Sequence, residues 1–216
     1  MSGQAGGRRS PVQRALEAAD WLSLRAVWAG GVLLFAAAFT VSVDVIARKL
    51  FTVSLGGSDE LSGYAFAIGT AWSFAFALLR RVNVRVDALY QLLPKPVCAL
   101  LDILALVALG VFVAYLARWS WEVLATSWTL SAQSNSALKV PLWIPQTLWF
   151  SGLALFIVTL LLLLARALGL LFAGDWSGVN ELLGARSVRE EAEEEAEYAR
   201  GLERAGGLPQ TAGKPE

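Results

Sequence analysis

The chain has 216 residues, of which 56% are hydrophobic, and its mean hydropathy of +0.54 lies above the range of ordinary soluble domains. Its 18 basic and 18 acidic residues cancel to a formal net charge of zero and are gathered in loops and tails, so the charge does not indicate a nucleic-acid partner. A single cysteine, Cys98, and the absence of histidine exclude an internal disulfide, a bis-histidine haem and a histidine-based zinc site, and no cofactor is expected.

The N-terminal region divides into a leader and a helix start. Residues 1–10 are Gly-rich and basic, a composition that does not favour ordered structure. An S-x-x-Q capping box begins at Ser10, and Pro11 takes the first helical position. The helix that follows is expected to be either a short interfacial helix or the cytoplasmic end of the first membrane span. Glu17 and Asp20 interrupt the basic region that a cleaved signal peptide would need.

Four apolar stretches follow, each long enough to cross the hydrocarbon core of a bilayer. Trp side chains stand at several of their boundaries, where amphipathic rings prefer the membrane interface. The sequence therefore predicts an all-α integral membrane protein with four transmembrane helices. The expected spans are residues 27–43, 61–79, 97–117 and 143–164, inside a membrane domain of residues 11–172.

A charged island, LRRVNVRVDALYQ from Leu79 to Gln91, separates the two apolar hairpins. The leader and the island with its exit each carry four Lys or Arg residues, and the two outer loops carry two each. The positive-inside rule therefore places the island and both termini in the cytoplasm. Residues 173–216 are expected to form a charged cytoplasmic tail.

Charged residues also stand at the opposite ends of the spans. Asp44 and Arg48 lie one helical turn apart with the acid first, which favours an ion pair. Glu60 falls in the opening turn of the second span, where the free amides and the helix dipole stabilise a carboxylate. Arg118 and Glu122 form another one-turn pair near the outer end of the third span.

Small residues recur at every fourth position of the second span, at Gly69, Ser73 and Ala77. Such a ridge lets two helix backbones approach closely in lipid, although small residues are common in any membrane helix. These three residues are the predicted helix-packing positions.

The predicted spans contain no ionisable residue near their centres, because each charge lies within a few turns of a span end. Proteins that carry a polar solute usually show ionisable side chains or broken helices near the middle of the bilayer. The chain is therefore not expected to carry a substrate itself. Its flat apolar faces suit packing against another membrane protein.

The sequence resembles the small membrane subunit (DctQ-like) of tripartite ATP-independent periplasmic (TRAP) transporters over about Ala26 to Leu170. Four segments in order and at the family's spacing carry this resemblance. They are DVIARKLF at Asp44–Phe51, GGSDELSGYAF at Gly56–Phe66, LRRVNVRVDAL at Leu79–Leu89 and SNSALKVPLWIPQ at Ser134–Gln146.

The resemblance implies a multi-pass subunit of the bacterial inner (cytoplasmic) membrane with no enzymatic activity. A large TRAP permease subunit would hold the substrate and ion sites, and a periplasmic solute-binding protein would deliver a small organic anion. The small subunit would pack against the static scaffold of the permease within the lipid bilayer, and uptake would be driven by a sodium or proton gradient.

The resemblance also gives expectations for individual residues. At the outer edge, Asp44, Arg48 and Glu60 match the family's polar positions, and each could serve the helix end itself or contact a partner. In the inner loop the matching positions could hold a partner, follow the topology rule or bind anionic lipid. They are Arg81, Arg85, Asp87 and Asn83, and Asn83 stands where the family often has histidine.

Two other functions remain possible from the sequence. A membrane anchor for a redox complex is disfavoured by the absence of histidine as a haem ligand. A self-assembling small four-helix exporter would need an ionisable residue deep in a span.

Overall fold

The computed structural model describes residues 11–54, 56–81, 93–136, 138–184 and 196–201. The chain divides into two compact units, Met1–Gly184 and Ala185–Glu216. In the second unit, residues 196–201 are helical. The first unit contains the helices that concern the function.

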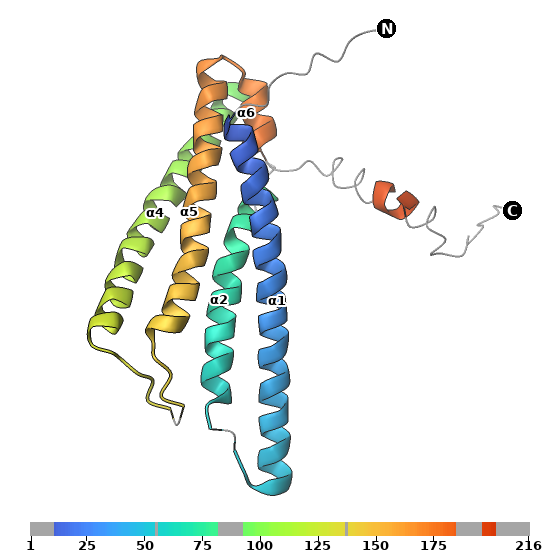
Figure 1. Cartoon of the computed structure of the whole chain (residues 1–216). Coiled ribbons are helices and arrows are strands. Elements are labelled where there is room, and N and C mark those ends of the chain that lie inside the picture. The colour runs from blue at the N-terminus through green and yellow to red at the C-terminus, as the bar shows by residue number, and fades with distance from the viewer. Residues whose placement is uncertain (1–10, 55, 82–92, 137, 185–195, 202–216) are drawn as a thin grey trace, which may run out of the picture. The chain divides into compact units, whose positions relative to one another are not determined.

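Five helices make up the first unit in its described part (Figure 1). Four of them are long and apolar enough to cross a membrane, which confirms the all-α prediction with four candidate spans. The residues described contain no strand, and two of them, Gln133 and Pro141, form an isolated bridge. The helices are α1 (Pro11–Phe51), α2 (Ser58–Leu79), α4 (Lys95–Thr129), α5 (Trp143–Phe172) and α6 (Trp176–Leu183).

The long helices lie side by side in the order α4, α5, α2, α1 (Figure 1). Helix α5 packs on both α4 and α2, and α1 packs mainly on α2. We call the end of this bundle that carries the α1–α2 and α4–α5 connections the loop end, and the opposite end, with the start of α1 and with α6, the terminal end. Helices α2 and α5 run in the same direction, from the loop end to the terminal end.

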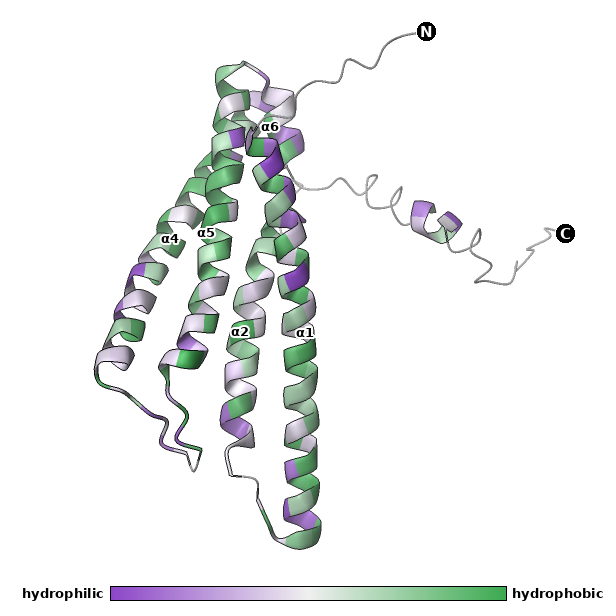
Figure 2. Ribbon diagram, viewed as in Figure 1, coloured by the Kyte–Doolittle hydropathy of each residue, from purple (hydrophilic) through white to green (hydrophobic). Residues whose placement is uncertain are grey.

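Helix α1 is a single unbroken helix of 41 residues, so it extends about 61 Å at a rise of 1.5 Å per residue. Of the two alternatives for its N-terminal part, the structure agrees with a direct continuation of the first span. Its buried residues are small or polar: Ala19, Ser23, Gly30 and Asp44. Two of them, Gly30 and Asp44, contact α2. The other faces of α1 are exposed and apolar (Figure 2).

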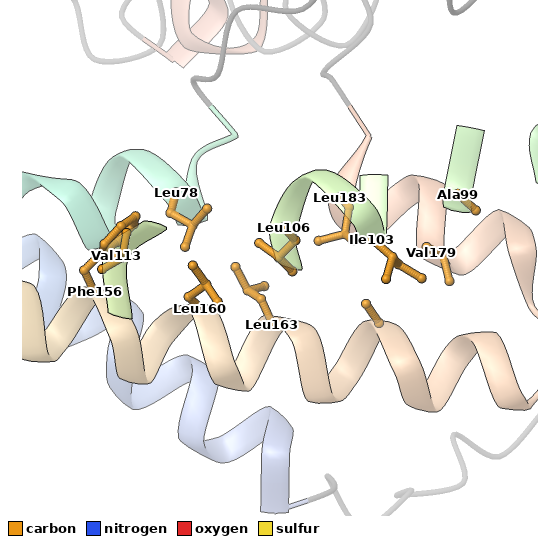
Figure 3. Close-up of a cluster of buried hydrophobic side chains, with 11 residues drawn as sticks. Leu78, Ala99, Ile103, Leu106, Val113, Phe156, Leu160, Leu163, Val179 and Leu183 are labelled. Atoms are coloured by element: carbon orange, nitrogen blue, oxygen red, sulfur yellow. The ribbon is translucent and has the colours of Figure 1, made fainter. Parts of the chain in front are cut away.

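The main hydrophobic cluster lies among α2, α4, α5 and α6 (Figure 3). Leu78 of α2, Leu106 of α4 and Leu160 of α5 point toward one another in it. Val179 and Leu183 of α6 complete the cluster at the terminal end and are both buried.

Helix α6 was not predicted, and the compact unit continues to Gly184 rather than stopping at residue 172. Asp175 caps this helix, because its carboxylate accepts a hydrogen bond from the Gly178 amide at 2.8 Å. Gly174, with φ of 73°, provides the turn that reverses the chain after α5. The residues of α6, which were predicted to belong to a charged tail, therefore fold back onto α4 and α5.

Candidate functional site

Asp44 is the centre of a hydrogen-bonded cluster at the loop end. Its carboxylate is 1% exposed and accepts hydrogen bonds from Arg48, from the Ser58 hydroxyl at 2.8 Å and from the Ser54 hydroxyl at 3.3 Å. A buried carboxylate is tolerated only when it is paired and hydrogen-bonded in this way. The cluster thus ties the end of α1 to the start of α2.

The pair of Asp44 and Arg48 is present as the spacing predicted, whereas its two serine partners were not predicted. The serines reach the carboxylate because the connection turns sharply at Gly56 and Gly57, which have φ of 62° and 133°. Such φ values suit glycine and are costly for other residues. The Gly-Gly pair in the sequence was the signal for this turn, but it gave no information about which hydroxyls would point at the carboxylate.

Glu60 connects the two loops of the loop end. Its carboxylate accepts a hydrogen bond from the Tyr64 hydroxyl, one turn further along α2, and hydrogen-bonds with Ser136 and Ser134 of the α4–α5 connection. The Ser134 hydroxyl also accepts the Val140 amide at 3.0 Å, which holds that connection in shape. Glu60 is therefore more than a carboxylate at a helix start, since it joins the second hairpin to the first.

Two arginines of the charged island have partners at the terminal end. Arg80 donates to the Asp20 carboxylate of α1 at 3.1 Å. Arg81 donates to the carbonyl oxygens of Glu181, at 2.6 Å, and Gly184, at 3.4 Å, at the end of α6. Both side chains thus join helices that are far apart in the sequence. The other predicted residues of this loop, Asn83, Arg85 and Asp87, lie outside the described residues.

We expect Arg81→Ala to loosen α6 from the bundle. The substitution removes a charged donor from two carbonyl oxygens at the end of α6, worth about 1–2 kcal/mol. Hydrogen–deuterium exchange of the α6 amides should become roughly tenfold faster. Arg80→Ala is the matched control, because it breaks the neighbouring pair with Asp20 and leaves α6 untouched. Equal exchange in α6 for both variants would refute the role of Arg81.

Close glycine contacts bring the helix backbones together. A Cβ atom on Gly152 of α5 would lie 2.7 Å from the carbonyl carbon of Ala71, so α5 and α2 meet without an intervening side chain. The Trp72 indole donates to the Leu148 carbonyl at 2.9 Å and lies 3.0 Å from the Ser151 hydroxyl. These contacts fix which turns of α2 and α5 lie at the same level.

The predicted packing ridge of α2 takes part in these contacts through one member. Gly69 faces Gly30 of α1, where an added Cβ would come within 3.0 Å of the Gly69 Cα. Ser73 is half-buried, and its hydroxyl donates to the Thr70 carbonyl of its own helix at 2.7 Å. Ala77 is also half-buried. The close contact of Gly152 with Ala71 was not predicted, and Ser151–Gly152 was the small pair in the sequence that could have indicated it.

The charged pair of α4 lies deeper along the bundle than the sequence suggested. Trp121, between Arg118 and Glu122, contacts Phe150 of α5, with the ring centroids 5.7 Å apart and the ring planes tilted by 52°. Phe150 is within one turn of Gly152, which touches Ala71 at the middle of α2. Helix α4 continues to Thr129, so the pair lies about two to three turns before the end of the helix, within the few turns that the sequence predicted but inside the span and not at the predicted boundary near residue 117.

The clusters described here act as ties between helices. Among the residues that the structure describes, no group of three or more His, Cys, Asp or Glu could hold a metal ion. Each predicted polar residue within the described ranges contacts another part of the same chain. The arrangement suits a structural element that keeps four membrane helices in a fixed register.

Comparison with known proteins gives one result. A family model described as "Tripartite ATP-independent periplasmic transporters, DctQ component" matches residues 37–170, more than half of the chain. The matched region begins within α1, contains α2 and α4, and ends within α5. No curated protein and no solved structure matches the chain.

Proposed function

Because the chain belongs to the DctQ component family of tripartite ATP-independent periplasmic transporters, we propose that it supports a large permease subunit in the membrane and does not carry the solute itself. The family match over residues 37–170 is the observation that carries this proposal. The four apolar helices are consistent with a subunit whose working surroundings are lipid and another membrane protein.

The internal contacts support a mechanical role. Asp44 and Glu60 tie the connections together at the loop end, and Arg80 and Arg81 tie the helices at the terminal end. A subunit fixed at both ends of its bundle can brace a neighbour without changing shape. The loop end would face the periplasm, where the solute-binding protein docks, and both termini would be cytoplasmic in the bacterial inner membrane.

The transported solute would be a small organic anion, and a sodium or proton gradient would drive its uptake. Both expectations come from the family resemblance. A self-assembling exporter built from this chain alone is less well supported, because the family match is to one component of a transporter that has other subunits.

Co-purification tests the proposal. The tagged chain is expressed with the large membrane protein encoded by a neighbouring reading frame, and the complex is isolated in mild detergent. We expect the large subunit to be recovered with the tagged chain in a fixed ratio. Recovery of the chain only as a stable homo-oligomer would contradict the proposal, as would solute accumulation by liposomes that contain this chain alone.

A further inference from the structure

The ion pair of Arg118 and Glu122 on α4 is exposed at a level where lipid chains are expected. Both side chains extend from the bundle and are 64% and 48% exposed. Through Trp121 and Phe150, Arg118 is about level with Gly152, which contacts Ala71 of α2, and Glu122 lies about 6 Å nearer the loop end.

The charges of α2 locate this level in the bilayer. The uncharged residues 61–79 have a length of about 28 Å, close to the thickness of the hydrocarbon core, so Glu60 and Arg80 mark its two boundaries. Ala71 lies about 16 Å from the level of Glu60 and about 14 Å from that of Arg80. When the helices stand upright, Arg118 is therefore near the middle of the core and Glu122 about 10 Å inside its loop-end boundary.

Tilting the bundle does not bring both charges of the pair to the surface. Helix α5 packs on both α4 and α2, so the axes of α4 and α2 are at most about 16–20 Å apart. A tilt of about 20°, the average for membrane helices, shifts α4 by roughly 6–7 Å relative to α2. With the tilt toward the loop end, Arg118 still lies about 9 Å inside the boundary, and Glu122, four residues nearer that end, about 3 Å inside it. Over this range of tilt, in either direction, at least one charge of the pair therefore stays about 7 Å or more inside the hydrocarbon core.

An ion pair exposed at this depth needs polar neighbours that hydrocarbon cannot supply. The arginine has five N–H donors and the glutamate has several acceptor sites, of which their mutual contact satisfies only some. The pair also continues an exposed stripe of α4 at helical spacing that includes Leu104, Val111 and Tyr115. We call these five residues the α4 stripe.

Resting on the proposed function, we propose that the α4 stripe is the surface on which the large permease subunit docks. The docking helix of the partner would cover the apolar part of the stripe and present hydroxyl, amide or charged side chains to Arg118 and Glu122. Burying the pair between two proteins replaces lipid with hydrogen-bond partners.

Helix α1, on the opposite edge of the row of helices, provides the contrast. Its residues 26–43 include no charge, and Trp28, Phe35 and Phe39 are among its exposed side chains. Trp28 is close to the level of Arg118, because Gly30 packs on Gly69 just beside Ala71. Arg25, the nearest charge on α1, lies over the Trp21 ring, which is one turn nearer the terminal end, so this side chain extends toward the boundary. The requirement for a polar partner therefore singles out the pair on α4.

Photo-crosslinking of the complete complex tests this assignment. A benzophenone amino acid is introduced in place of Tyr115 on the stripe or, as the matched control, in place of Trp28 on α1; both native side chains are aromatic and exposed. After irradiation in membranes we expect an adduct with the large subunit from position 115 and none from position 28. An adduct with a second copy of this chain, with lipid only, or with the large subunit from position 28 but not 115, would overturn the assignment.

A charge-removing variant gives an independent readout. Arg118→Met combined with Glu122→Gln keeps the side-chain size but removes both charges, and we expect recovery of the large subunit to fall about tenfold. The isolated variant should remain monodisperse on size-exclusion chromatography, because the pair is exposed in the free chain. Unchanged recovery would overturn the assignment and leave the proposed function intact. Failure of the wild-type chain to recover any large subunit would instead contradict the proposed function.

Discussion

Gly152→Leu should separate α5 from α2 and destabilise the bundle. Even the Cβ atom at this position would lie 2.7 Å from the Ala71 carbonyl carbon and 2.8 Å from Cδ1 of Trp72. The nearest atom belongs to the backbone and cannot rotate away, so the helices must move apart. Overpacking of this kind costs typically about 1–3 kcal/mol, and we expect a value at the upper end.

Thermal unfolding in detergent, followed by size-exclusion chromatography of the fluorescently tagged chain, measures this effect. A loss of about 3 kcal/mol should lower the midpoint by roughly 6–12 °C for a chain of this size. The indole hydrogen bond from Trp72 to the Leu148 carbonyl should be lost at the same time, which a shift in tryptophan fluorescence can report.

Gly169→Leu is the matched control for this prediction. Gly169 is in the same helix, but a Cβ atom there would have no neighbour within 4 Å. Leucine is also the better helix former, so this variant should be neutral or slightly more stable. A similar loss of stability in both variants would show that the α2–α5 contact is not what position 152 provides.

Properties carried by short stretches of the sequence were predictable. The apolar runs located the four long helices, because length and hydropathy are sufficient to identify a membrane span. The pairs of Asp44 with Arg48 and of Arg118 with Glu122 followed from their spacing of four residues.

Properties set by contacts between helices were not predictable in the same way. The depth of Arg118 depends on how Gly152 of α5 fits against Ala71 of α2. This contact joins two helices, so the sequence of one span cannot predict it. Helix α6 is short and depends on α4 and α5 to cover Val179 and Leu183, so its residues alone read as part of a polar tail. The partners of Asp44 depend on the turn at Gly56, and the carbonyl oxygens that Arg81 binds depend on α6.

These differences have a common origin in the physics of membrane helices. The bilayer determines which segments become helices, and this depends only on the local composition of each segment. The arrangement of the helices is then set by close packing and by a few polar ties, since lipid gives no hydrophobic driving force between helices. In this chain, Gly152 of α5 makes a close packing contact with α2, and Asp44 of α1 makes a polar tie to α2.

Asp44→Ala should release the loop end of the first hairpin. The substitution removes a buried acceptor of hydrogen bonds from Ser58, Ser54 and Arg48. Hydrogen bonds to a charged group contribute about 1.5–3 kcal/mol. The contribution of the ion pair itself is smaller, because the Arg48 side chain is 53% exposed. We therefore expect a loss of about 2–3 kcal/mol, since the Ser58 hydroxyl is left buried without its acceptor.

The thermal midpoint and hydrogen–deuterium exchange at the start of α2 together measure this loss. Asp44→Asn keeps an acceptor oxygen and should recover part of the stability. Asp59→Ala is the control for removing an acid from the same region, because Asp59 is exposed in the first turn of α2 and contributes only about 0.3–1 kcal/mol through the helix dipole. If the alanine variants at positions 44 and 59 lost equal stability, the buried cluster would not hold the hairpin together. A larger loss at position 44, partly restored by asparagine, would show that the hydrogen bonds of this carboxylate fix the first hairpin and so position Glu60 for its contact with the second.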